Sequence, residues 1–227
     1  MYRIALLCLQ LLIIPVTVYC QANYQAGTLP QINLNLKLSN SLKLNAKLES
    51  RQIFSEKQAD AGAANRFRYE RTDLAMVITT KLSADNTIGG GYLIRLEDRK
   101  FIHRLIQQFN NVRRFESISV AQRIVTDETF GAGDPFNFRL RYRLSIEKPL
   151  NGLQIDPREF YAKFNNEYLG ILSGGTTDLE IRALVALGYN ATDENKIELG
   201  AEYRINEFNE SVRAQQFWLT IGWFISF

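Results

Sequence analysis

FRLRYRLSIE, residues 138–147, is the stretch of sequence that decides the fold. Its apolar and polar side chains alternate at every position. The apolar set is Phe138, Leu140, Tyr142, Leu144 and Ile146, and the polar set is Arg139, Arg141, Arg143, Ser145 and Glu147. Successive side chains of a β-strand point to opposite faces, so this period of two predicts a strand with one apolar and one charged face.

The same alternation recurs along the chain on both sides of that strand. Further strands are predicted at 31–38, 42–54, 73–82, 87–96, 101–109, 116–125, 160–172, 181–190, 196–205 and 215–227. The connections are polar and rich in Gly, Asn and Asp, as turns require. This direct count gives eleven strands. Bacterial single-chain barrels use even numbers, which favours about twelve strands, with 23–30 as a short first strand, or about ten.

Alternation alone fits two architectures, because a soluble barrel turns its apolar face inward and a membrane barrel turns it outward. Here every predicted strand has a large apolar set, more than the interior of a small closed barrel can hold. Some aromatic side chains of these faces lie near strand ends, as in the girdles at membrane interfaces. They are Tyr92, Tyr142, Tyr189, Tyr203, Trp223 and Phe227. The sequence therefore predicts an all-β fold, a single transmembrane antiparallel up-and-down β-barrel. The alternative is a soluble secreted β-barrel that binds a ligand.

The polar faces carry bulky charges of both signs that can pair across a narrow interior. The residues expected in this lumen are Arg51, Arg95, Arg123, Arg139, Arg141, Arg143, Glu147, Glu167, Arg182, Glu198, Glu202 and Arg204. One interpretation is a lumen lined for anions, since charged rings select permeating ions. We favour a lattice of salt bridges that fills and stiffens the barrel, because barrels open a clear aqueous channel only at larger strand numbers.

The first residues, MYRIALLCLQLLIIPVTVYCQA, have the layout of a secretory signal peptide. Arg3 supplies the positive n-region, and residues 4–14 form the apolar h-region. We expect a cleaved signal peptide at 1–22 and one barrel domain at 23–227. A retained N-terminal anchor and a lipid on Cys20 are alternatives, but Tyr19 occupies the position where lipidation needs a small residue.

Several segments together resemble a known family. They are the opening hairpin that ends at Arg51, FRLRYRLSIEKPL (138–150), NNEYL (165–169), RALVALGY (182–189), IELGAEY (197–203) and the terminal Phe227. In order and spacing they resemble domain-of-unknown-function family 2490, outer-membrane barrels of Bacteroidota-type bacteria. Members often carry Asn before the arginine that corresponds to Arg182, where this chain has Ile181. The resemblance implies a barrel in the bacterial outer membrane, and it implies no activity.

The closing stretch QQFWLTIGWFISF, 215–227, has apolar side chains at every second position. We expect it to pair with the first strand, which removes two exposed sheet edges. The resemblance further implies that the barrel-assembly machinery reads the terminal aromatic, with periplasmic chaperones as partners during biogenesis. The residues expected to carry this assembly signal are Leu219, Ile221, Trp223, Ile225 and Phe227.

Signals for enzyme chemistry are weak. His103 is the only histidine, and a histidine that activates a serine can hydrolyse lipids. Only a loop serine such as Ser173 offers a partner, so we expect no enzyme and keep a lipid-modifying hydrolase as the alternative. The GGG at 89–91 lacks the Lys and Ser/Thr of a phosphate loop.

No cofactor, metal or nucleic acid is expected. Cleavage after residue 22 removes both cysteines, Cys8 and Cys20, and leaves one histidine. A net charge of +3 does not indicate a nucleic-acid binder. The expected role is a structural barrel or a narrow passive channel that contacts outer-membrane lipid.

Overall fold

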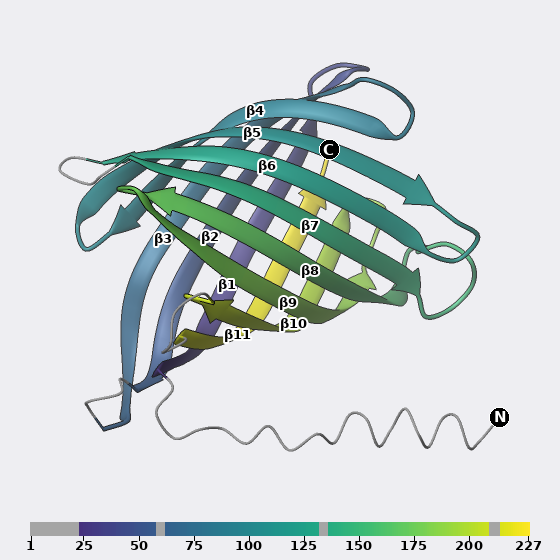
Figure 1. The fold of residues 1–227 in the computed structure, drawn as a ribbon. Helices are drawn as coiled ribbons and strands as arrows, with labels where there is room; N and C mark the ends of the chain where they lie inside the picture. Colours follow the sequence, from purple (N-terminus) through teal and green to yellow (C-terminus); the bar gives the residue numbers. More distant parts are fainter. Residues whose placement is uncertain (1–22, 58–61, 132–135, 209–213) are drawn as a thin grey trace.

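The computed structural model describes residues 23–57, 62–131, 136–208 and 214–227. The signal peptide predicted at 1–22 lies outside these residues. The described chain forms a closed barrel of eleven strands (Figure 1). This confirms the predicted all-β barrel, with one strand fewer than the twelve that we favoured. No helix long and apolar enough to cross a membrane occurs within the described ranges.

The strands follow one another around the barrel in chain order. Their bounds are β1 Asn23–Lys37, β2 Leu42–Lys57, β3 Ala64–Lys81, β4 Asn86–Glu97, β5 Lys100–Arg114, β6 Ser119–Gly131, β7 Asn137–Pro149, β8 Glu159–Ser173, β9 Thr176–Asn190, β10 Asn195–Asn206 and β11 Ala214–Ser226. Residues 23–30 are not a separate strand, because they form the first half of β1.

The odd number of strands decides how the barrel closes. Each strand pairs antiparallel with its sequence neighbour, so the first and the eleventh strand run in the same direction. β1 and β11 therefore pair parallel, from Asn23 opposite Ala214 to Asn35 opposite Ser226. Beyond the last of these pairs, the main-chain N–H of Phe227 donates to the carbonyl oxygen of Asn35 at 2.9 Å. We call this parallel junction the seam.

The two ends of the barrel have different connections. One end, here called mouth A, carries the connections 38–41, 82–85, 115–118, 150–158 and 191–194. The opposite end, mouth B, has two-residue turns at 98–99 and 174–175. Asp98, Arg99, Gly174 and Gly175 have φ of 50°, 63°, 55° and 88°, as two-residue hairpin turns with positive φ at both positions require.

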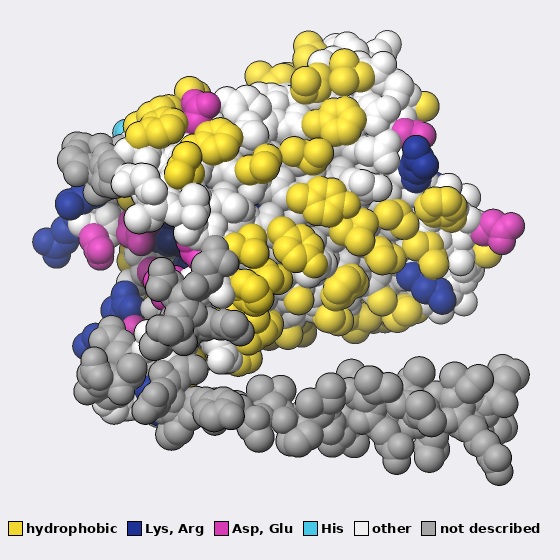
Figure 2. Space-filling view, in the orientation of Figure 1, with side chains coloured by type: hydrophobic (Ala, Val, Ile, Leu, Met, Phe, Trp, Pro, Cys, Tyr) yellow, Lys and Arg dark blue, Asp and Glu magenta, His cyan; other side chains and the backbone are white. Residues whose placement is uncertain are grey.

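Apolar side chains cover the outside of the barrel, and charged side chains fill the inside. Val185 and Leu199 on the outer face are 62% and 55% exposed, whereas Asp127 and Glu167 on the inner face are 1% and 2% exposed. Figure 2 shows the apolar side chains spread over one side of the barrel, with the charged ones gathered toward its ends. This is the reverse of a soluble barrel, in which the apolar face forms the core.

Candidate functional site

The candidate site is the charged interior, and its centre is built on β7. The period of two turns Arg139, Arg141 and Arg143 inward together, while Leu140 and Tyr142 point outward. The neighbouring strands β6 and β8 supply the carboxylates Asp127 and Glu167 on the same inner face. Three guanidinium groups in a row thus face one buried carboxylate on each side.

Asp127 joins three arginines from two strands. Nε of Arg104 on β5 lies 3.3 Å from Oδ1, and Nη2 of Arg141 lies 3.4 Å from Oδ2. Arg139 makes a close ion pair with the same carboxylate. Only 2% of the Asp127 side chain is exposed, and a buried carboxylate needs such partners because ionised groups are costly to remove from water.

Glu167 joins three arginines in the same way. Nε of Arg143 donates to Oε2 at 2.6 Å, and Nη1 of Arg182 donates to Oε1 at 3.0 Å. Nε of Arg141 lies 3.7 Å from Oε1, so Arg141 links the Asp127 and Glu167 groups. Arg182 also donates through Nε to Glu180 at 2.6 Å. We call the connected side chains of β5 to β9 the central lattice; they are Arg104, Asp127, Arg139, Arg141, Arg143, Glu167, Glu180 and Arg182.

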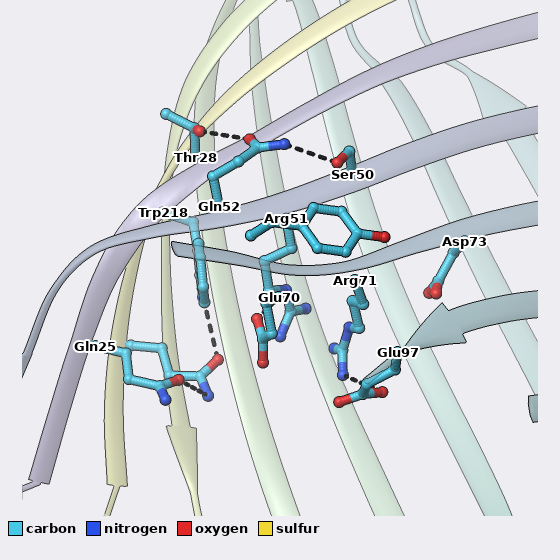
Figure 3. A network of polar contacts seen from close by, with 12 residues as sticks. Gln25, Thr28, Ser50, Arg51, Gln52, Glu70, Arg71, Asp73, Glu97 and Trp218 are labelled. Carbon is cyan, nitrogen blue, oxygen red and sulfur yellow. Dashed lines mark hydrogen bonds and ion pairs between the residues drawn. The ribbon is translucent and has the colours of Figure 1, made fainter. Parts of the chain in front are cut away.

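A second polar network lies beside the seam, on β1 to β4 and β11 (Figure 3). The guanidinium of Arg51 lies over the Trp218 ring, 4.6 Å from its centroid, and Nε is 3.4 Å from Glu70. The indole N–H of Trp218 donates to Gln216, which donates in turn to Gln25 across the seam at 3.2 Å.

Further ion pairs surround these two groups. Arg95 holds Asp73 in a two-point contact at 2.8 and 2.7 Å, a geometry that suits guanidinium and carboxylate. Arg204 pairs closely with Glu202 on its own strand.

Nearer mouth A, Lys163 lies between two carboxylates. It is 3.2 Å from Glu147 and 2.9 Å from Glu198. Glu198 also accepts the Tyr161 hydroxyl at 2.8 Å. The interior is therefore cross-linked along most of its length.

The structure places all twelve lumen residues predicted from the sequence on the inner face. Eleven of them take part in the ion pairs described above, and the twelfth is Arg123. Arg123 donates through Nε to the amide oxygen of Asn110 at 2.7 Å. No carboxylate lies within ion-pair distance of it among the described residues. Although it points inward, its side chain is exposed, so open space lies beside it in the lumen.

Sequence reasoning missed several members of the interior, most of all Arg104, Asp127, Glu180, Lys163 and Trp218. Asp127 and Glu180 fall just beyond the predicted strands 116–125 and 181–190, and both continue the period-two pattern of those strands. Extending each strand until the alternation stops finds both carboxylates.

His103 lies on the outer face of β5. Its Nδ1 is 2.7 Å from the Tyr92 hydroxyl of β4, and the two rings stack at 5.8 Å. Ser173, the serine considered as a partner, is at the end of β8, which pairs with β7 and β9 rather than β5. The histidine thus forms part of an aromatic pair on the outer surface. In the described residues, no cluster of three His, Cys, Asp or Glu side chains is arranged to hold a metal ion.

The residues expected to form an assembly signal lie on β11, with their side chains outward. Leu219, Ile221, Trp223 and Phe227 are 46%, 44%, 46% and 69% exposed, and Ile225 is half-buried. They form an apolar stripe along the last strand, next to the seam.

Comparisons with known proteins give one match. Neither curated proteins nor solved structures match the chain. Residues 26–215 match the family described as "Protein of unknown function (DUF2490)". The match begins in β1 and reaches the start of β11, so it spans almost the whole barrel. With most of its length matched and the barrel described above, this chain belongs to the DUF2490 family.

Proposed function

We propose that this protein is an exported outer-membrane β-barrel that acts as a structural barrel or a narrow passive channel. One observation carries the proposal, the apolar outer surface around a charged interior. Exposed apolar side chains such as Val185, Leu199 and Leu140 occur on strand after strand. In water such a surface favours association and aggregation, whereas in a bilayer it is the surface that lipid requires. Outer-membrane lipid is the partner that this surface fits.

The dimensions of the barrel support the same environment. Its strands are 12 to 18 residues long, and a tilted strand of about 9–11 residues crosses a bilayer. Closure leaves no strand edge without a partner, which hydrocarbon demands of every backbone group.

Paired aromatic rings lie toward both ends of the outer face. Phe160 and Tyr189 pack at 4.9 Å near mouth A, and Phe54 and Phe67 pack at 5.6 Å near mouth B. Aromatic girdles of this kind mark the two interfaces of membrane barrels.

The interior supports a narrow passage. The ion pairs of the central lattice tie the inner faces of β5 to β9 together. Arg123, which points inward and remains exposed, indicates that the lumen stays accessible to water near mouth A. We therefore infer a barrel that admits only small polar solutes.

The proposed protein partners are those that would assemble the barrel in the outer membrane. The outward stripe of β11 would be read by barrel-assembly machinery after periplasmic chaperones deliver the chain. Mouth A then faces the periplasm, because Phe227, the last residue of the expected assembly signal, lies at that end beside Asn35 and Lys37.

Two measurements test the proposal. Membrane fractionation combined with a heat-dependent gel shift should find a folded barrel in the outer membrane. Recovery from the soluble periplasm would overturn the membrane assignment. Conductance of the purified barrel in planar bilayers tests for a passage. If no conductance is measured, the channel role is rejected and the structural role remains.

A further inference from the structure

Arg123 of β6 and Arg143 of β7 lie directly opposite each other on the inner face. Side chains at such positions are nearest cross-strand neighbours, about 5 Å apart at Cβ, and like charges placed there are destabilising. Arg143 is neutralised by Glu167 on its far side, at 2.6 Å. Among the residues that the structure describes, Arg123 is hydrogen-bonded only to the neutral amide of Asn110. The pair thus retains an uncompensated positive charge.

The surrounding lattice does not remove this excess. Its five arginines, Arg104, Arg139, Arg141, Arg143 and Arg182, contact three carboxylates, Asp127, Glu167 and Glu180. Two positive charges are therefore left over before Arg123 adds a third. Asp127 and Glu167 each contact three arginines already, so neither carboxylate is available to neutralise Arg123. A mobile anion is the simplest counter-charge for such a group.

The two opposed arginines also have donors to spare. Each is held through Nε, by Asn110 and by Glu167 respectively, so its terminal nitrogens are the donors left for a ligand. Nε of Arg141, the next inward residue on β7, is buried without a hydrogen-bond partner in the described structure. Planar guanidinium groups bind phosphate and carboxylate oxygens through two parallel hydrogen bonds.

The position is reachable from outside the barrel. Arg123 lies four residues into β6 from Ser119, about 13 Å along the strand from mouth A. Its exposure shows that the space beside it is open. From Arg143, which lies opposite Arg123, the row continues toward mouth B through Arg141 and Arg139 in steps of about 6.6 Å.

We propose that Arg123 and Arg143 form a binding site for a small oxyanion in the lumen near mouth A. The inference deepens the proposed function and rests on its water-accessible interior. The ligand class is a phosphate, sulfate or carboxylate group small enough to enter the lumen. Arg141 and Arg139 give a bound anion a path of further cationic positions through the barrel.

Titration of the refolded full chain in detergent with inorganic phosphate, followed by calorimetry, tests the site. We expect saturable binding that Arg123→Gln weakens by at least tenfold. Lys148→Gln removes the same charge from an exposed position on the outer face of β7 and should change the affinity by less than twofold. A heat-dependent gel shift establishes that both variants fold. Absence of binding by the native chain, or equal binding by Arg123→Gln, would overturn the inference.

A second measurement needs no variant. In a planar bilayer under a KCl gradient, the reversal potential should show preference for chloride over potassium. Conductance with a preference for potassium would overturn the anion site but would still support the proposed passive channel. Phosphate binding without conductance would support the site and reject the passage, so the two proposals fail separately.

Discussion

Trp218 lies against the guanidinium of Arg51, whose Cζ is 4.6 Å from the centroid of the indole ring. The two residues come from β11 and β2, on either side of β1, so their contact spans the seam (Figure 3). Trp218 also packs with Leu29 and Ile53 in a small apolar cluster. Because it is 2% exposed, it acts as the main packing residue at the parallel junction.

Trp218→Ala should destabilise the barrel by about 3–5 kcal/mol, the usual effect of truncating a buried tryptophan. The loss combines an unfilled cavity with the removal of the cation–π contact to Arg51. Urea unfolding of the refolded protein in vesicles, followed by tryptophan fluorescence and gel shift, measures it. Trp223→Ala is the control, since Trp223 lies on the outer face and is 46% exposed. Equal losses in the two variants would contradict the role of Trp218 in the seam.

Glu167→Gln tests the central lattice. The change keeps the shape of the side chain but leaves Arg141, Arg143 and Arg182 without their shared negative charge. Removing one partner of a buried ion pair typically destabilises a protein by about 3–5 kcal/mol, and we expect a loss in this range.

The same unfolding assay provides the control for the lattice. Glu116 is exposed in the 115–118 connection, so Glu116→Gln should change the free energy of unfolding by about 0.5 kcal/mol or less. The double variant Glu167→Gln, Arg143→Gln should recover part of the loss, because it removes one of the unmatched cations. Strict additivity of the two single changes would show that the pair is not coupled.

The sequence predicted the strands well where one face is apolar without interruption. The stretch at 138–147 became β7, Asn137–Pro149, with the expected residues inside and outside. β3 was predicted only at 73–82, yet it begins at Ala64. The pairing of β2 with β3 shifts register between Arg51 and Gln52 and again between Ile53 and Ser55. The register shifts interrupt the alternation in this part of the sheet. Residues 64–72 are also rich in charge, so from sequence alone they resemble a loop.

The closure and the site were only partly predictable. An odd strand number with a parallel seam depends on the register of β1 against β11, which no local pattern contains. Arg104 was missed because Ile102 and Ile106 lie on the same face of β5. A face with one arginine between two isoleucines does not predict a polar lumen. Asp127 was missed because the predicted strand 116–125 ended too early, and Glu180 was missed because the predicted strand 181–190 began too late.

Gly27→Ala tests the close approach of β1 and β2 beside the seam. A Cβ at this position would lie 1.9 Å from the carbonyl oxygen of Gln52 and 2.8 Å from Cζ3 of Trp218. The carbonyl belongs to the backbone of β2 and cannot move away without breaking the register next to the bulge at Ala26 and Gly27. We expect loss of most of the folded, heat-modifiable band on refolding.

Gly62→Ala is the matched control for that variant, because a Cβ at Gly62 meets nothing within 4 Å. It should refold with the native yield. Normal refolding of Gly27→Ala would show that β1 and β2 tolerate a wider spacing here than the structure gives them.

Val185→Arg tests the environment of the outer face. Val185 points outward from β9 and is 62% exposed, between the outward-facing Phe164 and Ala201 of the neighbouring strands. If lipid covers this face, an arginine there destabilises the barrel by about 2–4 kcal/mol. If water covers it, a substitution at so exposed a position changes stability by about 0.5 kcal/mol or less. We expect the larger loss in lipid vesicles, measured by urea unfolding, and a small effect for Asp193→Arg in the exposed 191–194 connection. If Val185→Arg leaves the free energy of unfolding unchanged in vesicles, lipid does not cover this face, because an arginine in contact with hydrocarbon would destabilise the barrel.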